Sequence, residues 1–81
     1  MLKIKDDVDL KKLERYGFSV HAPIKQPEYK TYIHNSISIY GDVTFEKTDF
    51  TFPRRLIIKS TSIETMDCLY NLISDGLVEK I

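Results

Sequence analysis

The chain has 81 residues, and its 12 Lys and Arg side chains balance 12 Asp and Glu side chains. A chain of this length makes one small domain, residues 1–81, with a modest core and little room for a deep active-site cavity. The balanced charge excludes a strong overall field toward nucleic acid or an anionic membrane, so any electrostatic preference for a partner must be local.

The first elements are a short strand and a short helix. Residues 2–5 alternate apolar and basic side chains, which predicts a half-buried strand. Three aspartates follow, and Asp7 is the expected N-cap of a helix whose apolar stripe includes Leu13. The pair Gly17-Phe18 is typical of a helix that ends with a glycine and folds the next apolar residue back.

The middle of the chain has the pattern of a sheet. Residues 19–26 have no periodicity and contain proline, which predicts a surface loop. Residues 29–40 then alternate without a break in phase. They form either one long bent strand or a hairpin with a three-residue turn at 34–36, which places Ile33 opposite Ile37. We favour the hairpin.

A second hairpin is expected after residue 40. Taking residues 40–42 as a three-residue loop places Ile39 opposite Val43 and keeps apolar side chains on one face. A polar turn at 47–49 then leads into a strand within residues 50–58. The proline inside that last segment indicates an edge strand or a bulge.

The clearest element is a helix over residues 61–77. Thr61 and Glu64 have the spacing of a capping box, and Gly76 followed by Leu77 predicts a stop in which Leu77 contacts Leu72. Apolar side chains at steps of three and four residues predict a stripe that faces the core. This stripe consists of Ile63, Met66, Leu69, Tyr70, Ile73 and Leu77.

Together these elements predict an α+β fold. We expect a two-layer sandwich in which a short N-terminal helix and a longer C-terminal helix lie on one face of an antiparallel sheet of three to five strands. The other face would then be open. The candidates for partner binding on that face are Tyr32, His34, Tyr40, Arg55 and Lys59. Tyrosines and cations suit the stacking of bases or aromatic side chains and contact with phosphates, although an ordinary hydrated sheet face uses the same residue types.

Few residues could carry chemistry. His21, His34 and Cys68 are the good soft metal ligands, and their spacing matches no metal motif, so we expect no metal and no cofactor. On the helical wheel Cys68 lies nearly opposite the apolar stripe, which predicts an exposed and inert thiol. The three glycines stand singly, so no phosphate-binding loop is present. We expect that the protein is not an enzyme.

The flank of the last helix offers a second kind of surface. Leu72, Cys68 and Thr65 would form an open seam beside the stripe and permit a homodimer. The alternative is that Leu72 is occupied by its contact with Leu77 at the helix end.

The composition also bears on the compartment. The single cysteine excludes an internal disulfide and fits a reducing environment. No apolar run reaches the roughly 18 residues of a membrane span, and the first residues lack a secretory core. We therefore expect a cytoplasmic protein without a membrane partner.

Two terminal segments resemble a known group of proteins. Residues 2–18 (LKIKDDVDLKKLERYGF) and 69–81 (LYNLISDGLVEKI) are similar to the ends of small uncharacterised phage and prophage proteins of low-GC Gram-positive bacteria. This resemblance implies a phage-derived protein in a bacterial host cytoplasm and supplies no catalytic or binding residues. The leading hypothesis is a non-enzymatic protein-interaction module that acts on a host or phage macromolecule, for example as an inhibitor of a host defence complex. The alternative is a weak single-stranded nucleic-acid binder that uses the open sheet face.

Overall fold

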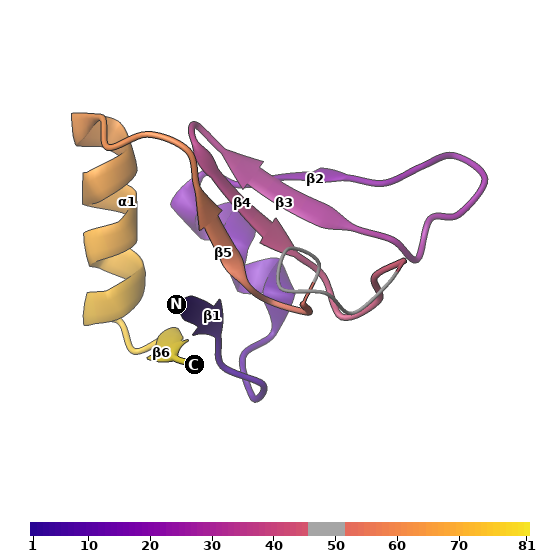
Figure 1. Cartoon of the computed structure of the whole chain (residues 1–81), viewed down its shortest axis with the longest axis horizontal. Helices are drawn as coiled ribbons and strands as arrows, with labels where there is room; N and C mark the ends of the chain where they lie inside the picture. Colours follow the sequence, from indigo (N-terminus) through magenta and orange to yellow (C-terminus); the bar gives the residue numbers. More distant parts are fainter. Residues whose placement is uncertain (46–51) are drawn as a thin grey trace.

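The computed structural model describes residues 1–45 and 52–81, and these form an α+β fold (Figure 1). The elements are β1 (Leu2–Ile4), the 3₁₀ helix η1 (Leu10–Tyr16), β2 (Ser19–His21), β3 (Thr31–His34), β4 (Ile37–Tyr40), β5 (Leu56–Ile58), α1 (Ile63–Ser74) and β6 (Val78–Lys80). Within the described residues, β2-β3-β4-β5 form one antiparallel sheet and β1-β6 another. The predicted α+β class is confirmed, and the predicted turn at 47–49 lies outside the described residues.

The smaller sheet joins the two ends of the chain. Strand β1 pairs antiparallel with β6, so that Leu2 lies opposite Lys80 and Ile4 opposite Val78. Figure 1 shows the N and C labels close together at this sheet. The alternation in residues 2–5 correctly predicted the first strand, and Ile4 is fully buried.

Both helices end in the way that the glycines predicted. Gly17 has φ 94°, and the Phe18 amide donates to the Leu13 carbonyl at 3.3 Å. Gly76 has φ 75°, and the Leu77 amide donates to the Leu72 carbonyl at 3.0 Å. These bonds are the six-residue closure of a Schellman motif, which brings the apolar residue after the glycine back onto the helix.

The helix starts differ from the prediction. The Asp9 carboxylate, and not that of Asp7, accepts from the Lys11 amide at 3.0 Å. Asp7 is not the N-cap, because it lies within the turn before the helix. This turn is closed by a hydrogen bond from the Val8 amide to the Lys5 carbonyl at 3.1 Å.

The start of α1 is also displaced, by one residue. Ser62, and not Thr61, caps the helix, and its hydroxyl accepts from the Thr65 amide. The Ser62 hydroxyl also donates to the Thr65 hydroxyl at 2.9 Å, which gives that buried oxygen a partner.

The β3–β4 hairpin is tighter than expected and reverses the predicted faces of β3 but not those of β4, where Ile37 and Ile39 are buried. His34 pairs with Ile37, so the turn has two residues and begins at Asn35, whose φ is 50°. Asparagine tolerates the left-handed region that two-residue hairpin turns require. A change of one residue in register moves every side chain to the other face of a strand. Tyr32 therefore lies opposite Ile39 on the core face, and the predicted three-residue turn is wrong.

Two other predicted segments also differ. Residues 19–21 form strand β2 and pair with β3, although the absence of periodicity predicted a loop. Ile39 lies opposite Leu56 of β5, not opposite Val43, which is 43% exposed. The expected second hairpin is wrong because β4 takes a partner from a distant segment. Strand β5 follows Pro53 and is an edge strand of its sheet, as the proline indicated.

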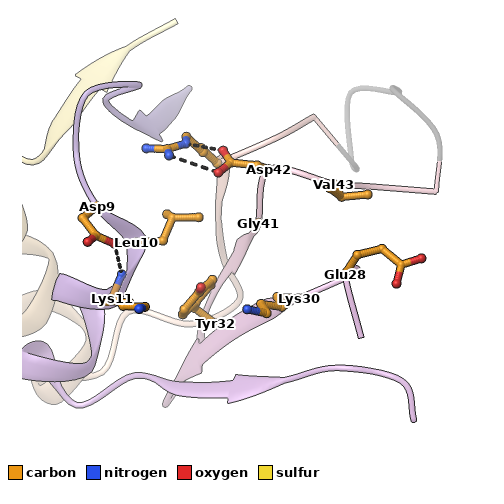
Figure 2. A pocket seen from close by; sticks show the side chains of 10 residues that line it. Asp9, Leu10, Lys11, Glu28, Lys30, Tyr32, Gly41, Asp42 and Val43 are labelled. Atoms are coloured by element: carbon orange, nitrogen blue, oxygen red, sulfur yellow. Dashed lines mark hydrogen bonds and ion pairs between the residues drawn. The ribbon is translucent and has the colours of Figure 1, made fainter. Parts of the chain in front are cut away.

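Arg54 ties three segments together. Its backbone amide donates to the Tyr40 carbonyl at 3.0 Å, and its carbonyl accepts from the Ile4 amide at 2.8 Å. Its side chain donates to the Lys5 and Val8 carbonyls at 2.6 and 2.7 Å. It also forms a two-point ion pair with Asp42 at 2.6 and 3.2 Å, drawn as two dashed lines at Asp42 in Figure 2. These contacts join the N-terminal segment to the larger sheet.

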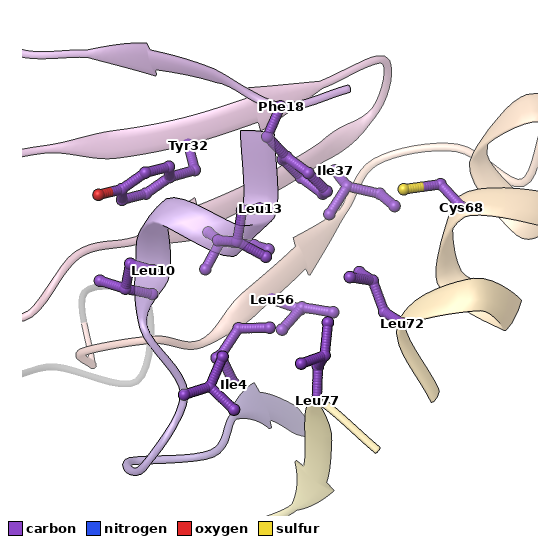
Figure 3. Packing of buried hydrophobic residues seen from close by; sticks show 12 residues of the cluster. Ile4, Leu10, Leu13, Phe18, Tyr32, Ile37, Leu56, Cys68, Leu72 and Leu77 are labelled. Atoms are coloured by element: carbon purple, nitrogen blue, oxygen red, sulfur yellow. The ribbon is translucent and has the colours of Figure 1, made fainter. Parts of the chain in front are cut away.

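The core lies on one side of the larger sheet, where both helices contribute to it (Figure 3). Its buried apolar side chains are Ile4, Val8, Leu10, Leu13, Phe18, Tyr32, Ile37, Ile39, Leu56, Cys68, Leu72 and Leu77. The two-layer arrangement predicted from the sequence is therefore present, with η1 and α1 packed against the same core.

Candidate functional site

Helix α1 packs on the core with the face that the sequence analysis assigned to solvent. Thr65, Cys68 and Leu72 are its buried residues. In Figure 3, Cys68 and Leu72 point from α1 toward Ile37 and Leu77. Both faces of α1 carry apolar residues, so their spacing alone does not decide which face is buried. The predicted orientation of α1 is wrong for this reason.

The opposite face of α1 carries the side chains that were expected in the core. Ile63 is 78%, Met66 46%, Tyr70 69% and Ile73 51% exposed. They follow at steps of three, four and three residues, which places them along one side of the helix. We call these four residues the outer stripe. Leu69, at the edge of the stripe, is partly buried against the core, and Leu77 is buried in it.

The predicted dimer seam is part of the core. Thr65 and Leu72 are fully buried, so the flank they form is not open to a second chain. Cys68 is also buried rather than exposed, and its thiol lies 3.8 Å from the Tyr16 carbonyl oxygen. Burial raises the pKa of the Cys68 thiol, because removing the thiolate from water costs free energy.

Charge is distributed unevenly along α1. Residues 61–76 contain Glu64, Asp67 and Asp75 and no Lys or Arg. The Asp75 carboxylate accepts a hydrogen bond from the Tyr16 hydroxyl at 2.5 Å, which raises the pKa of that tyrosine. Glu64 and Asp67 are exposed, and neither has an ion-pair partner among the described residues. Being three residues apart, they lie on one flank of α1, with Asp67 beside the outer stripe and Glu64 one step further toward Cys68.

Two of the predicted partner-binding residues face the core. Tyr32 is 5% exposed, and burial raises the pKa of its hydroxyl. His34 lies on the same face, next to Phe18, with 5.5 Å between the ring centres. The turn at Asn35 places both side chains beneath η1, so their assignment to an open face is wrong.

The other three predicted residues have the parity of the opposite face of the sheet, because Ile39 and Leu56 pair on the core face. Tyr40 is half-buried on the face of the larger sheet that points away from the core, which we call the far side. Its partner in β3 is Thr31, which neighbours Tyr32 and therefore points to the opposite face from Tyr32. Arg55 precedes β5 and forms an isolated bridge with Lys3 of β1. Lys59 follows β5 and is exposed.

The far side of the sheet has its own aromatic feature. The rings of Tyr29 and Phe45 stack 3.9 Å apart with 4° between their planes. They line a small hollow of about 100 Å³ together with Thr31 and Tyr40, which belong to this side of the sheet. Phe45 is 67% exposed.

A larger hollow of about 360 Å³ lies between η1 and the end of the sheet (Figure 2). Tyr32 is at its floor, between Lys11 and Lys30. Three acidic and three basic side chains line it: Asp9, Glu28, Asp42, Lys11, Lys30 and Arg54. These charges cancel, and Arg54 is already engaged by Asp42 and two carbonyls, so the hollow selects no charge class of ligand.

The sequence analysis missed two features of the structure, the exposure of the outer stripe and the role of Arg54. It recognised the outer-stripe residues as a set but placed them inward, since their spacing identifies a face and not its direction. It singled out Arg55 rather than Arg54, whose structural role depends on contacts with segments 12 to 49 residues away.

The described residues contain no group of three or more His, Cys, Asp or Glu side chains that could hold a metal ion. No helix among residues 1–45 and 52–81 is both long and apolar enough to cross a membrane. In comparisons with known proteins, no family model, no curated protein and no solved structure matches this chain.

Proposed function

We propose that this chain is a non-enzymatic protein-binding module that holds its partner with the outer stripe of α1. The observation that carries the proposal is the exposure of four large apolar side chains on one side of a single helix. Single exposed apolar residues are common, whereas a row of them on one element marks an interaction surface. Burying such a row supplies the main driving force of association.

The geometry of the outer stripe supports recognition through a helix. Ile63, Met66, Tyr70 and Ile73 have the spacing of the anchor residues with which an amphipathic helix binds another protein. Helix α1 has 12 residues and is therefore about 18 Å long. Its opposite side is attached to the core, so the helix is held in place before a partner arrives. A surface that is already ordered avoids part of the entropy cost of binding.

The resemblance of the terminal segments supplies the proposed setting. Proteins of that group are encoded by phages and prophages, so the partner would be a host or phage macromolecule in a bacterial cell. A host defence complex that the module inhibits is one such partner.

The proposal is tested by affinity capture from a bacterial lysate with nuclease added. The comparison is between the wild-type chain, the Met66→Ser/Tyr70→Ser variant and the control Ile24→Ser. Ile24 is 99% exposed and belongs to the segment between β2 and β3. In Figure 1 that segment extends away from α1. We expect wild type and the control to retain the same proteins and the α1 variant to lose them. Equal retention by all three chains would contradict the proposal.

A second candidate function is the binding of single-stranded nucleic acid by the far side of the sheet. The exposed Phe45 ring, stacked on Tyr29 and next to Lys30 at the same hollow, favours it, because bases stack on exposed aromatic rings beside cations. Anisotropy of a labelled oligonucleotide would be measured at low and physiological salt, with Phe45→Ala as the variant. Phosphate contacts make such binding fall steeply with salt. Absence of binding at low salt would exclude this candidate.

A further inference from the structure

The charges beside the outer stripe narrow the class of partner, if the outer stripe is the binding surface as proposed above. We propose that the partner presents an amphipathic helix with Lys or Arg residues along the edge of its apolar stripe. The outer stripe supplies the apolar half of this contact. Asp67 beside the outer stripe and Glu64 next to it on the same flank supply an acidic edge, and neither forms an ion pair with a cation among residues 1–45 and 52–81.

The acidic edge is a local feature of α1. The whole chain has no net charge, whereas residues 61–76 contain three carboxylates and no base. Asp75 is engaged by Tyr16, which leaves Glu64 and Asp67 exposed for a partner. Opposite charges along the rim of an apolar contact set partner choice and orientation, as they do at the edges of coiled-coil interfaces.

The same charges disfavour a second copy of this chain as the partner. A two-fold dimer uses the same patch on both subunits. A dimer through the outer stripe would bring the carboxylates of two α1 helices together, and neither helix contains a Lys or Arg to pair with them. Like charges brought together across an interface oppose association.

A helix also fits the shape of the surface. The outer stripe is a convex row of side chains at steps of three and four residues. Such rows pack into the grooves between the rows of another helix. Since the stripe runs along about three turns, a partner helix of similar length would cover it.

Two synthetic peptides test this proposal directly. The basic peptide is an amphipathic helix with a leucine stripe and lysines along both edges, and the acidic peptide has glutamates in place of the lysines. Binding of each to the full chain would be measured by calorimetry. We expect the basic peptide to bind more tightly, by on the order of tenfold, because two exposed ion pairs replace two repulsions. The preference should shrink at high salt.

Two variants with the same change in net charge distinguish the effect of the acidic edge on peptide preference from the effect of the overall charge. In Glu64→Lys/Asp67→Lys the preference should reverse toward the acidic peptide. In the control Asp7→Lys/Glu28→Lys, which changes exposed carboxylates outside α1, the preference should remain. Circular dichroism would verify that both variants are folded.

Each outcome has a distinct meaning. If both peptides bind equally well and Met66→Ser/Tyr70→Ser abolishes this binding, the inference about charge is overturned, whereas the outer stripe remains the binding surface. Binding of neither peptide by the wild type would overturn the inference and count against the proposed function as well. A wild-type dimer in sedimentation, lost in Met66→Ser/Tyr70→Ser, would identify a second copy as the partner and refute the inference alone.

Discussion

Replacing Arg54 by alanine should remove a large part of the stability of the domain. The guanidinium donates to the Lys5 and Val8 carbonyls at 2.6 and 2.7 Å and pairs with the Asp42 carboxylate. Arg54 is nearly buried, so its removal leaves two carbonyls without their charged donor. The segment that leads from β1 to η1 would lose its attachment to the larger sheet.

The magnitude follows from these contacts. The buried Val8 carbonyl loses its donor, which costs about 1–3 kcal/mol, whereas the Lys5 carbonyl keeps its bond from the Val8 amide and loses only one of two hydrogen bonds, about 1 kcal/mol. The ion pair adds at most about 1 kcal/mol, because the Asp42 side chain is 61% exposed. We therefore expect Arg54→Ala to lower the free energy of unfolding by about 2–5 kcal/mol. A domain of this length has roughly 4–12 kcal/mol in total.

Two further variants isolate the cause. Asp42→Asn should cost less than about 1 kcal/mol, because it weakens only the exposed ion pair. Arg54→Gly should be about 1 kcal/mol more stable than Arg54→Ala, because residue 54 has φ 66° and glycine adopts that angle without strain. Urea unfolding followed by circular dichroism gives all three values. A loss for Asp42→Asn as large as that for Arg54→Ala would refute the assignment to the two carbonyls.

Three other predictions follow from single contacts. Burial raises the pKa of Cys68, so its thiol should react slowly with a thiol reagent in the native protein and quickly in urea; equal rates would contradict its burial. The hydrogen bond to Asp75 raises the pKa of Tyr16, so its stabilising effect is present below about pH 10 and is lost as the pH rises further. In urea titrations at alkaline pH, wild type should therefore lose more stability than Tyr16→Phe. Equal losses would show that the hydrogen bond between Tyr16 and Asp75 does not stabilise the fold. Gly17→Ala should destabilise more than Gly76→Ala in urea: both have positive φ, but only at Gly17 would a Cβ meet another group, an imidazole ring at 2.9 Å. The reverse order would show that this close approach is not present in solution.

Local sequence signals predicted the parts of the fold that depend on local bonds. The α+β class, the first strand and both helix stops follow from spacing and from glycine, because a Schellman closure involves residues only five positions apart. The sequence analysis paired Leu77 with Leu72, and the Leu72 carbonyl accepts the closing bond from the Leu77 amide.

The register of β3 and β4 could not be predicted by phase alone. Turns of two and three residues both fit the alternation in residues 29–40, and they differ in which parity faces the core. The positive φ of Asn35 decides for the shorter turn. The asparagine was the available signal, since it tolerates that conformation better than most residues.

The pairing of distant segments was also beyond local patterns. Strand β4 pairs with β5, and the Ile4 amide bonds to the Arg54 carbonyl, so these contacts depend on packing of the whole domain. The orientation of α1 is of the same kind. The helix has apolar residues on two sides, and the packing of Cys68 and Leu72 in the core, which local patterns do not show, determines the buried side.

The orientation of α1 is most directly tested by two neighbouring residues on its opposite sides. Leu72 is fully buried, whereas Ile73 is 51% exposed. From urea unfolding we expect Leu72→Ala to lower the free energy of unfolding by about 2–5 kcal/mol and Ile73→Ala to lower it by less than about 1 kcal/mol. A larger loss for Ile73→Ala than for Leu72→Ala would place the outer stripe in the core and contradict its role as a binding surface.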